Sequence, residues 1–221
     1  MIETFAALIP QSLLPESGSV FYSGRAAFGA PSKLYVLGLN PGGSPLIQAR
    51  ETVAWHTNKV LNEEPDEWSA YSDESWGGAR PGTSGLQPRV LHLLRGLGLD
   101  ARRVPSSNVV FVRSARESTL NRSVAGLAEE CWSFHRSVID QLGVRVILCF
   151  GRTAGEWVAK KVSANNDVGT FVEANYRRWR TTALSNGRGL SVVIATHPSI
   201  ANWMVPATDP TPLVRQVLDR T

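Results

Sequence analysis

The sequence predicts an α/β fold with three layers, in which a central four-stranded parallel sheet is flanked by helices. Short, nearly continuous apolar runs rich in β-branched residues are typical of strands covered on both faces. Amphipathic helical patterns alternate with these runs, as in layered α/β proteins. The expected strands are residues 34–39, 109–112, 144–150 and 191–196. The expected helices are residues 86–97, 124–142 and 153–162, and a last helix that begins at Asp209 and Pro210 and ends near Asp219.

The chain has 221 residues, of which 43% are hydrophobic, and we interpret residues 1–221 as a single domain. There is no apolar run of 18 residues, so the sequence predicts no membrane span. The N-terminal segment carries an acid at Glu3 and no basic stretch, so we expect no signal peptide and a cytoplasmic protein. We also expect a monomer.

The two cysteines, Cys131 and Cys149, lie far apart between apolar or aromatic neighbours. We interpret them as buried free thiols. Two cysteines cannot supply a four-cysteine zinc site or iron–sulfur cluster, and the histidines show no metal-ligand spacing. We therefore expect neither a metal nor a cofactor.

Charge is unevenly distributed along the chain. Basic residues outnumber acidic ones two to one over residues 102–188, whereas residues 62–74 contain six acids and no base. A basic surface favours polyanions such as nucleic acids, although a mixed solvated surface is the simpler alternative. The acidic stretch belongs to a long, tryptophan-rich insert, residues 42–85, which leaves the carboxyl end of the first strand. Ligands bind at that edge of α/β sheets, so the insert is a candidate binding loop.

The first candidate site is the stretch KLYVLGLNPGGSP, where a buried strand ends on a polar residue. Pro41 keeps Asn40 extended at the strand tip. Gly42 and Gly43 permit close approach of a ligand to the backbone. The alternative is ordinary turn chemistry, because Asn-Pro and Pro-Gly pairs commonly mark turns.

The second candidate site is SVVIATHPSI, where another predicted strand ends on His197. Histidine is the usual acid, base or anion stabiliser near neutral pH. A lone histidine at a strand end is more often structural. In a parallel sheet, however, His197 and Asn40 emerge at the same edge, and each is followed by a proline.

Together, GLNPG (38–42) and HPS (197–199) resemble the two signature motifs of the uracil-DNA glycosylase superfamily. The first motif is similar to the form found in the mismatch-specific and single-strand-selective branches. The order and separation of the motifs fit, and FGRTA (150–154) after the third strand is similar as well. The resemblance implies a uracil-DNA glycosylase-like fold and base-excision repair of DNA, with the damaged nucleotide flipped into a pocket.

The resemblance also implies roles for individual residues. Asn40 would orient the attacking water, and His197 would stabilise the departing base anion by a hydrogen bond. The implied substrate contacts from the first motif are Gly38, Leu39, Pro41, Gly42 and Gly43. The implied DNA contacts are Ser44, Pro198 and Ser199.

Two departures from the family pattern concern base recognition and the wedge. Where the family's second strand ends on an asparagine that reads uracil, we place Arg113 or Ser114, which would read a different base. The apolar wedge that fills the vacated stack falls at Ile200 and Ala201, and Trp203 or Met204 would substitute for the small Ala201.

A stacking aromatic for the flipped base would come from the insert. Tyr71 and Trp76 are the candidates, with Trp55 behind them, although core packing is the alternative for each ring. The segment YRRWR (176–180) interleaves aromatic and arginine residues as nucleic-acid surfaces do, or forms a solvated edge strand.

The sequence thus predicts a monofunctional DNA glycosylase that hydrolyses the N-glycosidic bond of uracil or another deaminated or damaged base. Two alternatives remain open: a catalytically inactive nucleic-acid or nucleobase binding protein of the same fold, and a nucleotide or small-molecule hydrolase.

Overall fold

The computed structural model describes residues 1–116, 118, 120 and 122–221. The strands are β1 Leu34–Gly38, β2 Ser106–Asn108, β3 Val146–Phe150, β4 Asn166–Val172, β5 Arg180–Ser185 and β6 Ser191–Ala195. The α-helices are α1 Ile2–Ala6, α2 Arg25–Phe28, α3 Val53–Asn62, α4 Gln87–Gly96, α5 Val124–Leu142, α6 Arg152–Lys161 and α7 Thr211–Asp219. Two 3-10 turns, η1 Gln11–Leu13 and η2 Ala101–Arg103, complete the described elements.

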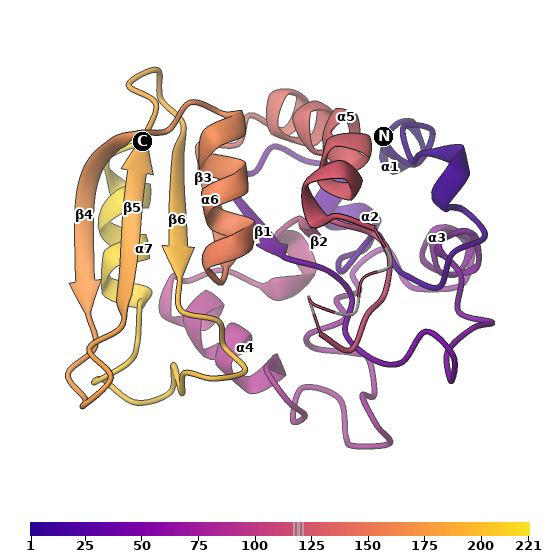
Figure 1. Ribbon diagram of the computed structural model, residues 1–221, viewed down its shortest axis with the longest axis horizontal. Coiled ribbons are helices and arrows are strands. Elements are labelled where there is room, and N and C mark those ends of the chain that lie inside the picture. The colour runs from indigo at the N-terminus through magenta and orange to yellow at the C-terminus, as the bar shows by residue number, and fades with distance from the viewer. Residues whose placement is uncertain (117, 119, 121) are drawn as a thin grey trace.

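The α/β class is confirmed, but the prediction of a four-stranded, wholly parallel sheet is wrong. The sheet has six strands in the order β2-β1-β3-β6-β5-β4. The first four run parallel, whereas β5 and β4 are antiparallel additions at one side (Figure 1). The antiparallel pair escaped prediction because its residues alternate or mix polar and apolar types and are largely half-buried or exposed.

The parallel strands are buried on both faces, which explains their continuous apolar sequences. Tyr35 and Leu37 of β1 pack on one face with residues of α1, α5 and α6. Leu34 and Val36 pack on the opposite face with residues of α4 and α7. The alternation of side chains along each strand therefore produces three layers, with helices on both faces of the sheet (Figure 1).

The position of β2 also differs from the prediction. The strand is the polar segment Ser106–Asn108, whereas Val109, Val110 and Phe111 are buried just beyond its end. The hydroxyls of its two serines are satisfied internally: Ser106 donates to the Val104 carbonyl at 3.2 Å and Ser107 to the Val20 carbonyl at 2.6 Å. As a result, β2 ends on Asn108.

Candidate functional site

The carboxyl ends of the four parallel strands border one cleft, with a volume of about 1750 Å³. The insert, residues after β6, the start of α6, β5 and part of the N-terminal segment complete its walls. The lining includes these residues predicted from sequence: Gly38, Leu39, Asn40, Gly42, Gly43, Tyr71, Trp76, Arg113, Ser114, His197 and Ser199. Pro41, Ser44, Pro198, Ala201 and Trp203 are not part of that lining. The sheet edge therefore brings both motifs into one cavity, as parallel strands require.

Asn40 is half-buried and held in one orientation by its amide nitrogen. Nδ2 donates to the Pro41 carbonyl at 2.9 Å and to Ser114 Oγ at 3.0 Å. The Ser114 hydroxyl itself donates to the carbonyl of Arg116 at 2.8 Å, so its oxygen accepts from Asn40. With Nδ2 committed to these acceptors, the carbonyl oxygen Oδ1 is turned away from them and can accept a hydrogen bond from a bound water.

His197 is half-buried and holds a defined tautomer. The backbone N–H of Ser199 donates to Nδ1 at 3.1 Å, so this nitrogen is the acceptor and Nε2 carries the proton. The Ser199 hydroxyl oxygen also lies 2.7 Å from Nδ1. Burial lowers the pKa of His197, which favours the neutral ring. A neutral imidazole with a proton on Nε2 is a hydrogen-bond donor suited to a developing anion.

Asn108, which sequence reasoning missed, lines the cleft at the end of β2. Its side chain is buried beside the Tyr22 hydroxyl, and its Nδ2 makes no hydrogen bond of normal geometry with a described residue. A Cβ built on Gly38 would lie 2.1 Å from Asn108 Oδ1, so the absence of a side chain at Gly38 makes room for this amide. The expectation that the second strand lacks a terminal asparagine is therefore wrong: the strand ends earlier than the apolar run suggested.

Arg113 lies in the cleft wall, but its guanidinium group is occupied by protein groups. It donates to the Gly42 carbonyl at 2.7 Å and to Glu51 Oε2 at 3.0 Å. Its Nε donates to Ser17 Oγ at 3.2 Å. Arg113 thus ties two positions of the insert, Gly42 and Glu51, to Ser17. Ser114 orients Asn40. Arg113 and Ser114 are therefore committed to protein contacts, whereas Asn108 Nδ2 has no hydrogen-bond partner among the described residues.

The loop after β1 depends on a glycine at position 43. Gly43 has φ +106°, in the region that favours glycine, and a Cβ there would lie 2.1 Å from Gln48 Oε1. Glycine at this position lets the chain turn sharply beside Asn40 and leaves the backbone open to the cleft.

Aromatic rings form another part of the cleft wall. Tyr71 meets Phe150 edge to face at a centroid distance of 6.4 Å and Trp76 at 6.1 Å. Burial raises the pKa of Tyr71, so its hydroxyl stays protonated. Trp76 is half-buried, and its Nε1 donates to Glu74 Oε2 at 2.8 Å. Tyr71 is buried in the core, so Trp76 is the ring of this pair that keeps surface on which a flat ligand can stack.

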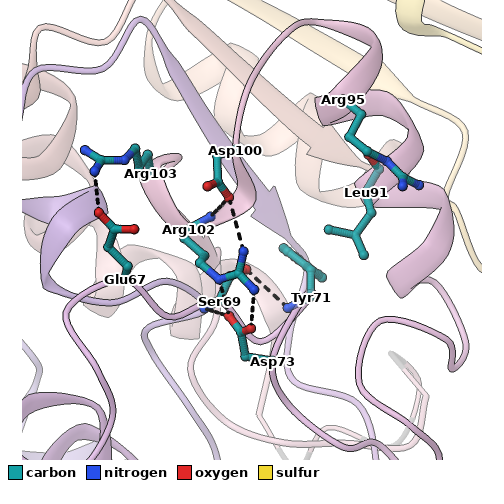
Figure 2. Close-up of polar contacts among 9 residues, drawn as sticks. All are labelled: Glu67, Ser69, Tyr71, Asp73, Leu91, Arg95, Asp100, Arg102 and Arg103. Carbon is teal, nitrogen blue, oxygen red and sulfur yellow. Dashed lines mark hydrogen bonds and ion pairs between the residues drawn. The ribbon is translucent and has the colours of Figure 1, made fainter.

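An ion-pair clamp fixes the segment that carries Tyr71, as Figure 2 shows. Arg102, on η2, donates to Asp73 through Nη2 at 2.5 Å and Nε at 3.0 Å. Asp73 in turn accepts from the backbone N–H of Ser69 at 3.0 Å, and the Tyr71 N–H donates to Ser69 Oγ at 3.3 Å. The bidentate ion pair between Arg102 and Asp73 therefore anchors the acidic insert to η2, the turn that precedes β2.

The wedge candidates differ sharply in exposure. Ala201 and Trp203 are buried, and the Trp203 ring packs on Phe150 at 5.4 Å and donates to the Thr196 carbonyl. Buried side chains cannot enter a base stack, so these two residues do not present themselves to DNA. Ile200, Met204 and Val205 are exposed apolar side chains of this loop, and Ile200 also lines the cleft.

His56 of α3 is a further cleft residue that the sequence did not single out. It is buried, and its Nδ1 has no hydrogen-bond partner among the described residues. Burial, with Lys59 and Arg113 nearby, lowers its pKa to about 3. His56 is therefore neutral at physiological pH.

Both cysteines are buried free thiols, as predicted. In the described part of the chain no group of three or more His, Cys, Asp or Glu side chains is placed to hold a metal ion. None of the helices that the structure describes combines the length and apolarity needed to cross a membrane. Comparison with protein-family models finds no match, and comparison with curated proteins finds none either.

Proposed function

We propose that this protein is a monofunctional DNA glycosylase that hydrolyses the N-glycosidic bond of uracil or a related deaminated base. The observation that carries the proposal is the meeting of Asn40, Asn108 and His197 in one cleft at the ends of β1, β2 and β6. Each offers a different function: an acceptor for water, a paired donor and acceptor, and a neutral N–H donor.

Base recognition would rest on Asn108. A carboxamide places an N–H donor beside a carbonyl acceptor. This pattern complements the carbonyl and adjacent N–H on the pairing edge of uracil, and equally that of hypoxanthine or xanthine. The unsatisfied Nδ2 of Asn108 supports this role, because a buried amide without a partner gains a hydrogen bond when such a base enters.

Bond cleavage would depend on His197 and Asn40. As the C1′–N bond breaks, its electron pair moves to the base, and the sugar acquires oxocarbenium character. The Nε2 proton of His197 would stabilise the negative charge on the base oxygen. A water held by Asn40 Oδ1 would attack C1′; its oxygen becomes the new sugar hydroxyl, and its proton ends on the released base. The amide orients this water and does not act as a base.

A glycosylase assay tests the proposal. Labelled oligonucleotides that carry uracil, hypoxanthine or xanthine, single-stranded and in each mispair, are incubated with protein and cleaved at abasic sites by alkali. We expect cleavage for at least one base, reduced about a hundredfold or more by Asn40→Ala and by His197→Ala. Binding to every substrate without cleavage would favour the inactive binding protein. Hydrolysis of free nucleosides with no DNA affinity would favour the small-molecule hydrolase.

A matched variant separates recognition from chemistry. Asn108→Asp keeps the size of the side chain and replaces the N–H donor with an acceptor. We expect it to lose uracil excision, since two acceptors then face each other across the base edge. Uracil excision at the wild-type rate by this variant would contradict the role of Asn108.

A further inference from the structure

The connection between β4 and β5, residues 173–179, projects beside the cleft. In the antiparallel register Thr182 pairs with Ile194, so β5 begins next to the residues that follow β6. Figure 1 shows this connection at the edge where β6 ends. Arg177 donates to the Ile200 carbonyl at 3.1 Å, which joins the connection to the loop that carries His197.

This hairpin tip is ordered by its own hydrogen bonds. Asn175 Oδ1 accepts from the backbone N–H groups of Arg177 at 2.9 Å and Arg178 at 3.2 Å. The Asn175 amide donates to buried Glu173 at 2.7 Å. Ala174 donates to the Ala207 carbonyl at 2.8 Å. The tip is therefore preorganised before any ligand binds.

The tip presents aromatic rings held by an arginine. Tyr176 is 88% exposed and Trp179 is 37% exposed. The Arg177 guanidinium lies 4.6 Å from the centroid of Trp179 and 5.6 Å from that of Tyr176. Its Nε also donates to the Tyr176 hydroxyl at 3.1 Å. The Tyr176 ring is thus held in place by Arg177 while most of its surface stays open to solvent.

Three arginines lie beside these rings, and the one acid of the segment, Glu173, is buried. The tip and the start of β5 carry Arg177, Arg178 and Arg180. Within the described part of the chain, the ion pairs involve other residues, and none joins a carboxylate to these three guanidinium groups. Uncompensated arginines beside exposed rings are the combination that binds single-stranded nucleic acid, whose bases stack and whose phosphates attract cations.

We propose that the hairpin tip is a stacking platform for the single-stranded DNA that flanks the nucleotide in the cleft. Tyr176 would stack an unpaired base, and the arginines would contact the adjacent phosphates. Trp179 and Arg180 also line the cleft, so the platform is continuous with it. Bases of an intact duplex are already stacked on one another, so the platform favours unpaired over paired flanking DNA. The inference rests on the proposed function for the identity of the cleft, whereas the platform itself is measured independently of catalysis.

The test measures binding of a labelled twelve-nucleotide oligothymidylate and of a twelve-base-pair undamaged duplex by fluorescence anisotropy. We expect Tyr176→Ala to weaken binding of the single strand at least about fivefold, the effect of losing one stacked base. Tyr176→Phe keeps the ring and should stay within about twofold of the wild type. Arg178→Ala should weaken binding and flatten its salt dependence, whereas Arg136→Ala, an equal loss of charge on α5, should change both less.

Several results would overturn the platform. These are equal binding of the single strand by wild type and Tyr176→Ala, or an equal loss of duplex binding by the variant. A wild type that sediments as a dimer, with a Tyr176→Ala variant that sediments as a monomer, would also overturn it by assigning the exposed rings to self-association. The uracil excision assay on the same proteins keeps the two proposals apart. Excision by the wild type with binding indifferent to Tyr176 removes only the platform. Tyr176-dependent binding without excision of any base removes only the glycosylase.

Discussion

The packing of Gly38 against Asn108 makes a quantitative prediction about the cleft. Gly38 ends β1, and a Cβ on this residue would lie 2.1 Å from Asn108 Oδ1 and 3.3 Å from Asn108 Cγ. The first distance is far inside van der Waals contact. Gly38→Ala must therefore displace the Asn108 amide, which is only 5% exposed and has little room to move.

The expected cost follows from this overlap. Extra methyl groups in packed interiors cost about 1–3 kcal/mol of unfolding free energy. For a chain of this size, about 1 kcal/mol lowers Tm by roughly 2–4 °C. Gly42→Ala is the matched control: its Cβ would meet nothing within 4 Å, so we expect a much smaller change in stability. Uracil excision by Gly38→Ala should fall roughly 5- to 150-fold, as expected for one lost hydrogen bond to a buried group.

A double-mutant cycle provides the assay. Unfolding free energies are measured by urea denaturation for Gly38→Ala, Asn108→Ala and the double variant. Because Asn108→Ala removes the obstructing amide, Gly38→Ala should cost close to nothing in that background. A cost for Gly38→Ala that is equal in both backgrounds, within about 0.5 kcal/mol, would refute the reasoning.

Two further predictions concern stability. Burial lowers the pKa of His56 to about 3 and that of His135 to about 4, whereas both titrate near 6.5 when unfolded. The unfolded chain therefore binds more protons below pH 6.5. The free energy of unfolding should therefore fall from pH 6.5 towards pH 4 by up to about 1.4 kcal/mol per pH unit for each histidine. A His56→Leu variant should show a shallower fall of this free energy in urea titrations at each pH. An identical pH dependence in the variant and the wild type would contradict this. Arg102→Ala should lower Tm by roughly 2–4 °C through loss of a part-exposed bidentate pair, and Arg103→Ala, whose pair with Glu67 is more exposed, should change it less in the same thermal scan; equal shifts would contradict the clamp.

Much of the sheet followed from sequence because buried parallel strands leave continuous apolar runs. The runs over β1, β3 and β6 gave those strands nearly correct bounds. The same rule failed for β2, where serines satisfied by backbone carbonyls form the strand and the apolar run lies beyond it. β4 and β5 were not predicted because their residues are largely half-buried or exposed, and such strands need no continuous apolar run.

The candidate site was predictable where a side chain follows directly from a strand. Asn40 and His197 were identified in this way, and both line the cleft. Asn108 was not predicted as a site residue because its place at the sheet edge depends on where β2 ends. That end is set by the pairing of β2 with β1, which the sequence of β2 alone does not reveal. The exposure of individual side chains could not be predicted from the sequence either. Trp203 was a candidate wedge but is fully buried, whereas Ile200 is exposed and lines the cleft.

The most direct test of the central claim follows the products of the proposed reaction. Oligonucleotides that carry uracil, hypoxanthine or xanthine are incubated with the protein, and the products are analysed by mass spectrometry without alkali treatment. The account predicts a free base from at least one substrate and an abasic strand of unchanged length, both formed by the wild type and suppressed by Asn40→Ala and His197→Ala. No free base, or equal product from both variants, would contradict it.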